Sequence, residues 1–342
     1  MKRGQDLSIS VAIPTRKRAG SLICCIGSVL RNDRPELREI IVVANPDDRA
    51  ALEYCAELAK TQPKMKVEIC PLPCRNTAKN QAVAAASSEY IYFLDDDITL
   101  PPGNIKALCA KIRQHPDAAA IGGPNVTPEN SCTIWEQAIG LVLLQPFATY
   151  MTRARYIAAP RDFKATENAL QSCNLCMKKS ALANYSRPFE TSFFSGEETL
   201  LLYRLRKDGL AMISSPELKA EHHRRSGFAS FCRQIFLCGA GRAQMSRLEP
   251  QSFKTVFAIP ALFVLYMAAL AFCPPLRQYP ASLWPLYPYF ALLVLSVAAT
   301  SLTSPLKPAL LTLLLIPALH LSYGSGFIVG LLGNKKTPKA IR

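Results

Sequence analysis

Residues 89–100 read EYIYFLDDDITL, an apolar run that ends in three consecutive carboxylates, Asp95, Asp96 and Asp97. A short, unbroken apolar run rich in aromatic and branched side chains is typical of a strand buried on both faces of a parallel sheet. Ligands of open α/β sheets bind just beyond the carboxyl ends of the strands, which is where these carboxylates lie. Three adjacent carboxylates repel one another, and a divalent cation relieves that repulsion. Because Mg²⁺ or Mn²⁺ is usually held by one or two carboxylates and substrate phosphates, the stretch predicts a metal–diphosphate site, with a solvated acidic turn as the alternative.

The chain on either side of this stretch alternates between strand-like and helix-like patterns. Helices are expected over residues 21–30, 47–60 and 78–86, and strands over residues 7–13, 39–43, 66–70, 90–94 and 172–177. This alternation predicts an α/β fold with a mostly parallel, Rossmann-like sheet and flanking helices. The basic turn PTRKR at residues 14–18 either meets phosphate or is a solvated loop.

The formal charge of the 342-residue chain is +15, which favours an anionic partner such as nucleic acid, a phosphorylated substrate or an anionic membrane face. Its 12 cysteines are scattered, and the first residues do not resemble a secretory leader. We therefore expect reduced cysteines in the cytosol. Cys173 and Cys176 form a CxxC without a second pair at zinc spacing, so a small buried pair is favoured over a metal site.

Three apolar segments follow near the C-terminus, at residues 256–273, 283–302 and 309–332. Each approaches or exceeds the roughly 20 residues that cross a bilayer. The sequence therefore predicts a catalytic domain over residues 1–250 and a bundle of transmembrane helices over residues 251–342. Residues 224–254 carry six Lys or Arg against one acid, as expected of a cytoplasmic juxtamembrane segment. The third segment, which contains Gly324 and Gly326, either spans the membrane or is re-entrant or interfacial.

Two further segments have helical patterns. Residues 134–144 are apolar but too short to span a bilayer, so they lie at a membrane surface or cap the catalytic core, and the core is favoured. Residues 195–209 read SGEETLLLYRLRKDG, in which Ser195 precedes Glu198 at the spacing of a capping box. Glu198 is therefore either a helix cap or a catalytic carboxylate.

Taken in order, six motifs resemble the family 2 inverting glycosyltransferases with a GT-A fold, over about residues 7–245. They are VAIPTRKR (11–18), EIIVVANPDD (39–48), RNTAKNQAVAAASSEYIYFLDDD (75–97), SCNLCMKK (172–179), GEETLLLYRLRKDG (196–209) and AEHHRR (220–225). The apolar segments and HLSYGSGF (320–327) resemble the membrane-bound members that build bacterial exopolysaccharide, of the succinoglycan type.

The resemblance implies a role for each matching residue. The donor nucleotide and diphosphate would be contacted by Pro14, Thr15, Arg16, Lys79, Asn80, Asp95 and Asp96. Mg²⁺ or Mn²⁺ would be held by Asp95 and Asp97 of the DxD motif, completed by His222 or His223. Glu197 and Glu198 match the family's Glu-Asp pair, whose second member is the base.

The implied activity is inverting transfer of a sugar from a nucleotide-diphosphate sugar to a hydroxyl of a polyprenyl-diphosphate-linked saccharide. The implied place is the bacterial inner membrane, with the catalytic domain cytoplasmic, membrane lipids as partners and no nucleic acid. Three alternatives stay open at this point: a nucleotidyltransferase, a glycoside hydrolase with a membrane anchor, and a non-catalytic membrane receptor or transporter component. The residues from Gln234 onward read QIFLC and so lack the QxxRW pattern of processive synthases. The residues after the second strand, Ala44, Asn45 and Pro46, include no acid that would fix the choice of base.

Overall fold

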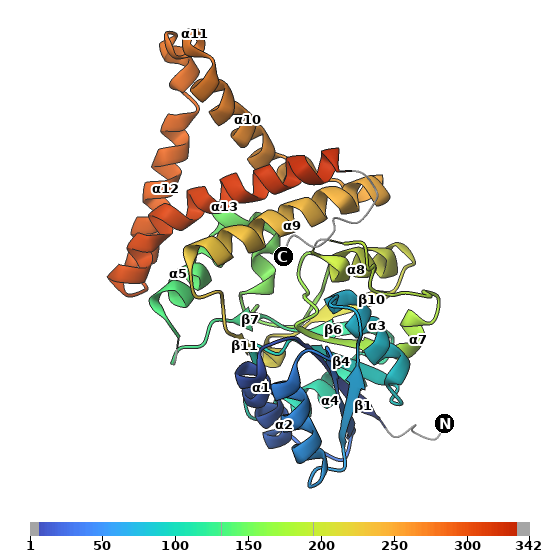
Figure 1. Ribbon diagram of the computed structural model, residues 1–342. Helices are drawn as coiled ribbons and strands as arrows, with labels where there is room; N and C mark the ends of the chain where they lie inside the picture. The colour runs from blue at the N-terminus through green and yellow to red at the C-terminus, as the bar shows by residue number, and fades with distance from the viewer. Residues whose placement is uncertain (1–6, 131, 194, 334–342) are drawn as a thin grey trace. The chain divides into compact units, whose positions relative to one another are not determined.

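The computed structural model describes residues 7–130, 132–193 and 195–333 (Figure 1). The chain divides into two compact units. Unit 1 contains residues 7–126, Ala154–Thr191 and Glu197–His223, and unit 2 contains Thr127–Arg153, Ser192–Gly196 and residues 224–333. Three segments that the sequence assigned to the catalytic domain, residues 127–153, 192–196 and 224–250, belong to unit 2.

The main sheet of unit 1 has the strand order β3-β2-β1-β4-β9-β6-β10-β8. The pairs along β3, β2, β1 and β4 are parallel, as are β6 and β10, whereas β9 is antiparallel to both β4 and β6. The strands are β1 Ile9–Thr15, β2 Leu37–Ala44, β3 Met65–Ile69, β4 Tyr90–Leu94, β6 Ala118–Gly122, β8 Phe163–Lys164, β9 Asn174–Lys178 and β10 Ala211–Ser214. The helices of unit 1 are α1 Ala19–Arg31, α2 Arg49–Ala59, α3 Arg75–Ala85, α4 Asn104–Gln114, α7 Lys179–Leu182 and α8 Glu197–Lys207.

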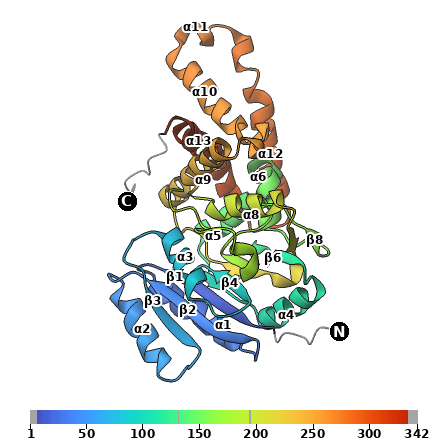
Figure 2. The same cartoon turned by 90° about the vertical axis from the view of Figure 1, so that its right-hand side faces the viewer.

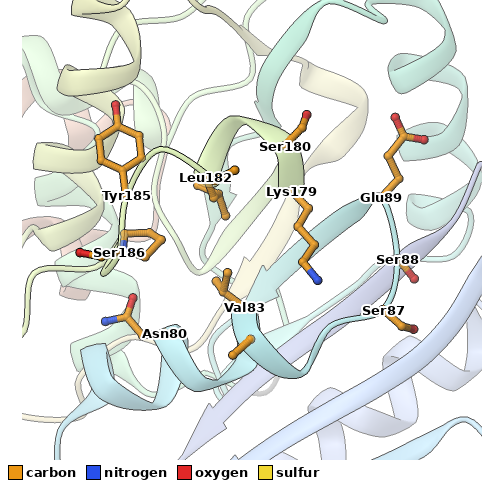
Figure 3. Close-up of a pocket in the computed structure, with 13 residues that line it drawn as sticks. Asn80, Val83, Ser87, Ser88, Glu89, Lys179, Ser180, Leu182, Tyr185 and Ser186 are labelled. Atoms are coloured by element: carbon orange, nitrogen blue, oxygen red, sulfur yellow. The ribbon is translucent and has the colours of Figure 1, made fainter.

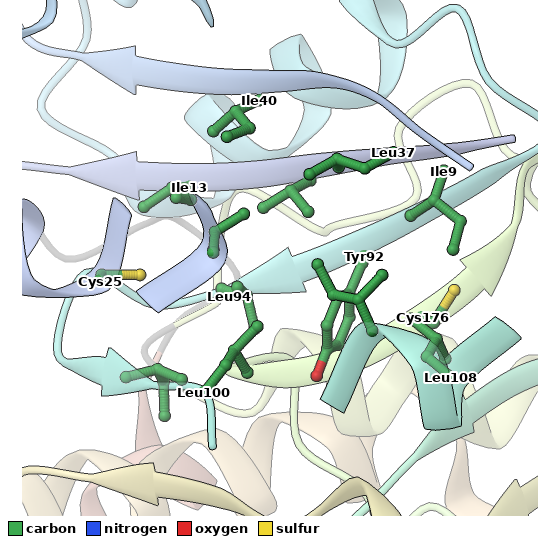
Figure 4. Packing of buried hydrophobic residues seen from close by; sticks show 14 of the residues in the cluster. Ile9, Ile13, Cys25, Leu37, Ile40, Tyr92, Leu94, Leu100, Leu108 and Cys176 are labelled. Carbon is green, nitrogen blue, oxygen red and sulfur yellow. The ribbon is translucent and has the colours of Figure 1, made fainter. Parts of the chain in front are cut away.

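Each central strand is buried on both faces, as the unbroken apolar runs predict. Alternate residues of β4 enter different cores: Tyr92 and Leu94 pack with α1, α2 and α4, while Ile91 and Phe93 pack with α3 and α8. Figure 4 shows the first of these cores, in which Tyr92 and Leu94 lie among Ile9, Ile13, Leu37 and Leu108. The fold class predicted from sequence is confirmed.

The expected strands and helices of unit 1 are present, with ends shifted by a few residues. β4 has the predicted bounds, Tyr90–Leu94. Helix α3 begins three residues earlier than predicted, and β1 continues through Pro14 and Thr15, so the basic turn begins only at Arg16. A separate small sheet joins β5 Ile98–Thr99, β11 Ala220–His222 and β7 Asn125–Val126, and thereby connects the chain after the aspartates to the histidine motif.

The described part of unit 2 is helical. Its α-helices are α5 Ile134–Leu143, α6 Pro146–Thr149, α9 Phe228–Leu248, α10 Ile259–Phe272, α11 Pro274–Arg277, α12 Leu286–Ser301 and α13 Leu306–Leu332. The short α11 lies between α10 and α12 in the chain, and these two helices diverge from it in Figure 1, whereas they overlap in the view of Figure 2. The segment 134–144 forms α5, which packs against α13 within unit 2.

Two of the three predicted membrane segments form helices long and apolar enough to cross a bilayer, Pro280–Ser301 and Leu306–Leu332. The first predicted segment forms only the 14-residue α10, preceded by a short 3₁₀ helix at Thr255–Phe257, and is too short to count as a span. The third is one continuous helix of 27 residues that contains Pro317, so it has no re-entrant break. Large apolar side chains on these helices are exposed, among them Leu295, Phe272, Leu302 and Leu332.

Glycines bring α13 close to α9 and α10. The two long helices α9 and α13 lie side by side (Figure 1). A Cβ on Gly326 would lie 1.9 Å from the carbonyl oxygen of Phe236, and one on Gly239 would lie 2.1 Å from that of Tyr323. Such separations exclude any side chain, because the atom met is backbone. Arg247 Nη1 also donates to Gly330 O at 3.1 Å, so part of the basic segment serves this contact.

We predict that Gly326→Ala destabilises unit 2 by about 1–3 kcal/mol, the usual cost of forcing an extra methyl into a packed site. The added Cβ meets backbone of α9, which cannot rotate away. Gly20→Ala on α1 is the control, since no atom lies within 4 Å of the added methyl. Thermal unfolding of the purified protein measures both, and equal melting temperatures for the two variants would contradict the close packing.

Candidate active site

The carboxyl ends of β1 and β4 adjoin in the sheet, and this edge holds Asp96 firmly. Thr15 Oγ1 donates a hydrogen bond of 2.8 Å to Asp96 Oδ2, and Arg18 Nη1 lies 3.1 Å from Oδ1. Burial raises the pKa of Asp96 to about 6, with a further rise from Asp97 and Asp95 that Arg18 and Thr15 oppose. The middle carboxylate therefore has a structural part in the site and points into the protein.

Asp97 meets the histidine motif. His222 Nε2 lies 3.2 Å from Asp97 Oδ1, and the backbone amide of His223 donates to Asp97 O at 3.1 Å. The small sheet fixes this geometry, because His222 pairs with Ile98 in the antiparallel ladder of β11 and β5. Arg18 Nη1 approaches the other carboxylate oxygen of Asp97 at 2.7 Å. The structure thus brings together Asp97 and His222, which the sequence places 125 positions apart.

Asp95 has the weakest polar contacts of the three carboxylates. Its Oδ2 lies 3.7 Å from Arg75 Nη1, and its Oδ1 is buried without a hydrogen-bond partner among the described residues. A buried carboxylate oxygen left in this way favours a cation or donor nearby, so the residues present fit a divalent metal at Asp95 and Asp97. Within residues 7–130, 132–193 and 195–333, no group of three or more His, Cys, Asp or Glu side chains is arranged to hold a metal ion.

Glu197, at the start of α8, is locked in a buried ion pair. Lys79 Nζ lies 2.8 Å from Glu197 Oε1 and also donates to Ser172 Oγ at 2.6 Å. Neither Lys79 nor Glu197 is exposed to solvent beyond 1%. Burial alone would raise the pKa of Glu197, but the charges of Lys79 and Arg75 lower it to about 2. A carboxylate that binds protons so weakly is a poor base at neutral pH.

Glu198 differs from its neighbour in charge environment. Its side chain is buried, and both burial and the negative charge of Glu197 raise its pKa above the ordinary value. A carboxylate with a raised pKa accepts a proton more readily at neutral pH. Of the two predicted catalytic residues, the electrostatics therefore favour Glu198 as the base.

The predicted capping box of Ser195 and Glu198 is not formed. Helix α8 begins at Glu197, which puts Glu198 at its second position, one residue too early for that motif. Ser195 Oγ instead lies 3.8 Å from Cys238 Sγ. Gly196 precedes the helix with φ of 82°, a backbone conformation that glycine adopts without strain. The alternative in which Glu198 is only a cap therefore loses its support.

Lys79 and Asn80 both make contacts within unit 1. Lys79 is fully buried, and its Nζ donates to Glu197 Oε1 at 2.8 Å. Asn80 Nδ2 donates to Phe189 O at 2.7 Å, and its Oδ1 accepts from Phe189 N at 2.9 Å. Both side chains therefore stabilise the structure around the site through internal contacts.

Arg16 and Lys17 join the loop after β1 to the loop after β2. Arg16 lies 3.7 Å and Lys17 2.9 Å from Asp47, and the Lys17 amide donates to the Asp48 carboxylate. Lys17 has φ of 55°, an unusual value for a residue with a side chain. Arg16 remains 44% exposed, so its side chain is accessible to a ligand, whereas Pro14 is buried in β1.

The sequence matches that of a known family over the same elements. The sequence profile of "Glycosyl transferase family 2" covers residues 10–181, which is half of the chain and includes most of β1, the three aspartates and β9. The chain belongs to glycosyl transferase family 2. The predicted family is thereby confirmed, and the readings as nucleotidyltransferase, glycoside hydrolase or non-catalytic membrane component fall away.

One solved structure shares the fold of this chain, and a second shows a weaker similarity. The mannosyltransferase PcManGT from Pyrobaculum calidifontis, in complex with GDP-Man and Mn²⁺, is similar at 14% identity, over 96% of this chain and 91% of that one, with a TM-score of 0.59. A 1–349 fragment of S. aureus TarS in complex with UDP-GlcNAc matches 70% of each chain at 16% identity, with a TM-score of 0.47. The first likeness establishes a GT-A-like fold. A search of curated protein sequences found no match.

Two arginines of the glycosyltransferase site were missed as site residues in the sequence. Arg18 was included only as part of a basic turn, yet it pairs with both Asp96 and Asp97. Arg75 lies between Asp95 and Glu197. The number of carboxylates in these motifs indicates that cations lie nearby. Only the fold shows that Arg18 and Arg75 are those cations.

A hollow of about 540 Å³ lies elsewhere in unit 1 (Figure 3). Its lining comes from the end of α3, the turn before β4 and the segment after β9, and includes Asn80, Ser88, Lys179 and Tyr185. It adjoins the amino end of β4, whereas the aspartates follow the carboxyl end. This hollow is therefore distinct from the cluster of aspartates.

We predict that Lys79→Met destabilises unit 1 by about 3–5 kcal/mol, since it leaves the Glu197 carboxylate buried without its main counter-charge. Because Glu197 has a lowered pKa in the folded protein, the pair stabilises above about pH 4.5 and loses its effect as the pH falls towards 2. The difference from wild type should shrink over that range in denaturant unfolding. The exposed Lys60–Glu57 pair is the control, where Lys60→Met should cost under about 1 kcal/mol. Equal costs at both sites would contradict the buried pair.

Proposed function

We propose that the protein is an inverting glycosyltransferase that moves a sugar from a nucleotide-diphosphate sugar to an acceptor hydroxyl. The observation that carries the proposal is the difference in charge environment between two adjacent carboxylates, Glu197 and Glu198. Glu197 is neutralised by Lys79, while Glu198 has a raised pKa and forms no ion pair with another described residue. One carboxylate is thus available as a base within the unit that also contains the aspartates.

The donor diphosphate would lie at the carboxyl end of β4. Asp95 and Asp97 would hold Mg²⁺ or Mn²⁺, with His222 beside Asp97 and the exposed Arg16 towards the nucleotide. The bound metal would neutralise the charge that grows on the departing diphosphate. The complex of PcManGT with GDP-Man and Mn²⁺ supports this choice of ligand class by analogy of fold.

The chemical step is a single displacement. The acceptor hydroxyl attacks the anomeric carbon, Glu198 takes the hydroxyl proton, and the bond to the diphosphate oxygen breaks with its electron pair on the leaving group. One displacement inverts the anomeric centre. Arg155 Nη2 donates to Thr199 Oγ1 at 3.0 Å, which holds the first turn of α8 and so positions Glu198.

The acceptor is proposed to be a saccharide linked to a polyprenyl diphosphate at the cytoplasmic face of a bacterial inner membrane, in exopolysaccharide synthesis. Two helices of unit 2 have the length and apolar composition of membrane spans, and many of their large apolar side chains are exposed. A lipid acceptor would keep the reacting hydroxyl at the membrane surface. The resemblance to succinoglycan-type enzymes supports the pathway assignment.

The direct test is release of nucleoside diphosphate when purified protein meets a set of sugar nucleotides and lipid-linked acceptors. Product analysis by NMR should show an inverted anomeric centre. A retained configuration, or no release with any donor, would contradict the proposal.

Glu198→Gln should lower kcat about a hundredfold or more, the usual range for a lost general base, because an amide cannot take the proton. Donor affinity and melting temperature should stay near wild type. In the wild-type protein the rate should rise with pH through the raised pKa of Glu198 and then level off.

Glu197→Gln provides the contrast in this experiment. It leaves the Lys79 ammonium buried beside an amide, so its main effect should be a lower melting temperature. Near-normal turnover by Glu198→Gln would mean that the base is another residue.

A further inference from the structure

Arg75 begins α3, and its guanidinium lies between the two acidic parts of the site. Nη1 is 3.7 Å from Asp95 Oδ2, and Nη2 is 3.6 Å from Glu197 Oε1. Both separations are too long for hydrogen bonds, and in the part of the chain that the structure describes the guanidinium donates none. The side chain is also 48% exposed. Its charge alone holds it there, and its five N–H donors remain available.

The two carboxylates that Arg75 faces are incompletely satisfied. Asp95 Oδ1 and Glu197 Oε2 are both buried, and neither has a hydrogen-bond partner among the described residues. Glu197 has a second counter-ion in Lys79, whereas Arg75 is the cation paired with Asp95. An ion pair this loose compensates a buried carboxylate only in part, which leaves Asp95 able to bind a stronger cation.

We propose, on the basis of the function proposed above, that Arg75 has two roles. Before a divalent metal binds, it supplies the positive charge beside Asp95, and once the metal is bound it binds the donor diphosphate. Without metal, the guanidinium neutralises Asp95. When metal occupies Asp95, the two cations repel each other and the long Arg75 side chain turns towards solvent, where the diphosphate would lie. A planar guanidinium matches two phosphate oxygens at once, so the displaced side chain has a partner ready.

This exchange predicts effects of opposite sign from a single substitution. A positive charge less than 4 Å from a metal ligand opposes binding of the metal alone, so Arg75→Gln should tighten Mn²⁺ binding in the absence of nucleotide by about fivefold or more. The same substitution removes a phosphate contact. Binding of UDP or GDP at saturating Mn²⁺ should therefore weaken by about tenfold or more. A residue with a merely structural role would weaken both.

The experiment titrates purified full-length protein with Mn²⁺ alone, followed by electron paramagnetic resonance, and then with UDP and with GDP at saturating Mn²⁺. Arg49→Gln is the matched control, because it removes the same charge from unit 1. Arg49 is the first residue of α2 and is exposed. Arg75→Lys is the second variant, since it keeps the positive charge but loses the planar guanidinium that can contact two phosphate oxygens at once. It should bind Mn²⁺ like wild type and bind the nucleotides more weakly.

Tighter Mn²⁺ binding with weaker nucleotide binding in Arg75→Gln, absent from Arg49→Gln, supports the exchange. Unchanged or weaker Mn²⁺ binding, an equal gain in the control, or no Mn²⁺ binding by any of the proteins overturns it. If Arg75→Gln does not fold, unchanged nucleotide binding by Arg75→Lys overturns it. Failure of the proposed function is seen separately, as absence of diphosphate release from sugar nucleotides by wild type.

Discussion

The site depends on the uneven neutralisation of its negative charge. Unit 1 gathers five carboxylates at the end of β4 and the start of α8, and cations from three other elements oppose them: Arg18, Arg75, Lys79 and, when protonated, His222. Glu197 is matched by a buried ammonium, and Asp96 is tied to β1. Asp95 has only a loose cation, and Glu198 has a raised pKa. Asp95 and Glu198, the two groups with the least compensation, are among those for which we propose roles in chemistry.

The apolar runs predicted most of the sheet because a strand buried on both faces leaves little ambiguity in sequence. Tyr90–Leu94 has the expected bounds, and the two faces of β4 enter separate cores. Periodicity could not predict that Lys79 would turn inward to Glu197, since nothing local distinguishes a buried lysine from an exposed one. The link between Asp97 and His222 depends on a short antiparallel ladder, which the sequence signalled only through the ordered motifs of the family.

The C-terminal helices show where hydropathy is a poor guide. An uncharged run of 18 residues gave a helix of 14, because the chain enters it through a 3₁₀ turn and leaves it at two prolines. Conversely, Gly324 and Gly326 suggested a break in the last segment but serve as contact points instead. Their missing side chains let α13 approach the backbones of α10 and α9. Glycine in an apolar helix has either meaning, and only the packing partner decides between them.

The central claim is that the edge beyond β4 binds a diphosphate through a metal, and one binding measurement tests it directly. Calorimetric titration of the protein with sugar nucleotides should show binding that requires Mn²⁺ or Mg²⁺ and that EDTA abolishes. Asp95→Asn keeps the size of the side chain but removes its charge, so it should weaken the metal-dependent binding by an order of magnitude or more. Donor binding that is unchanged both by EDTA and by Asp95→Asn would contradict the account.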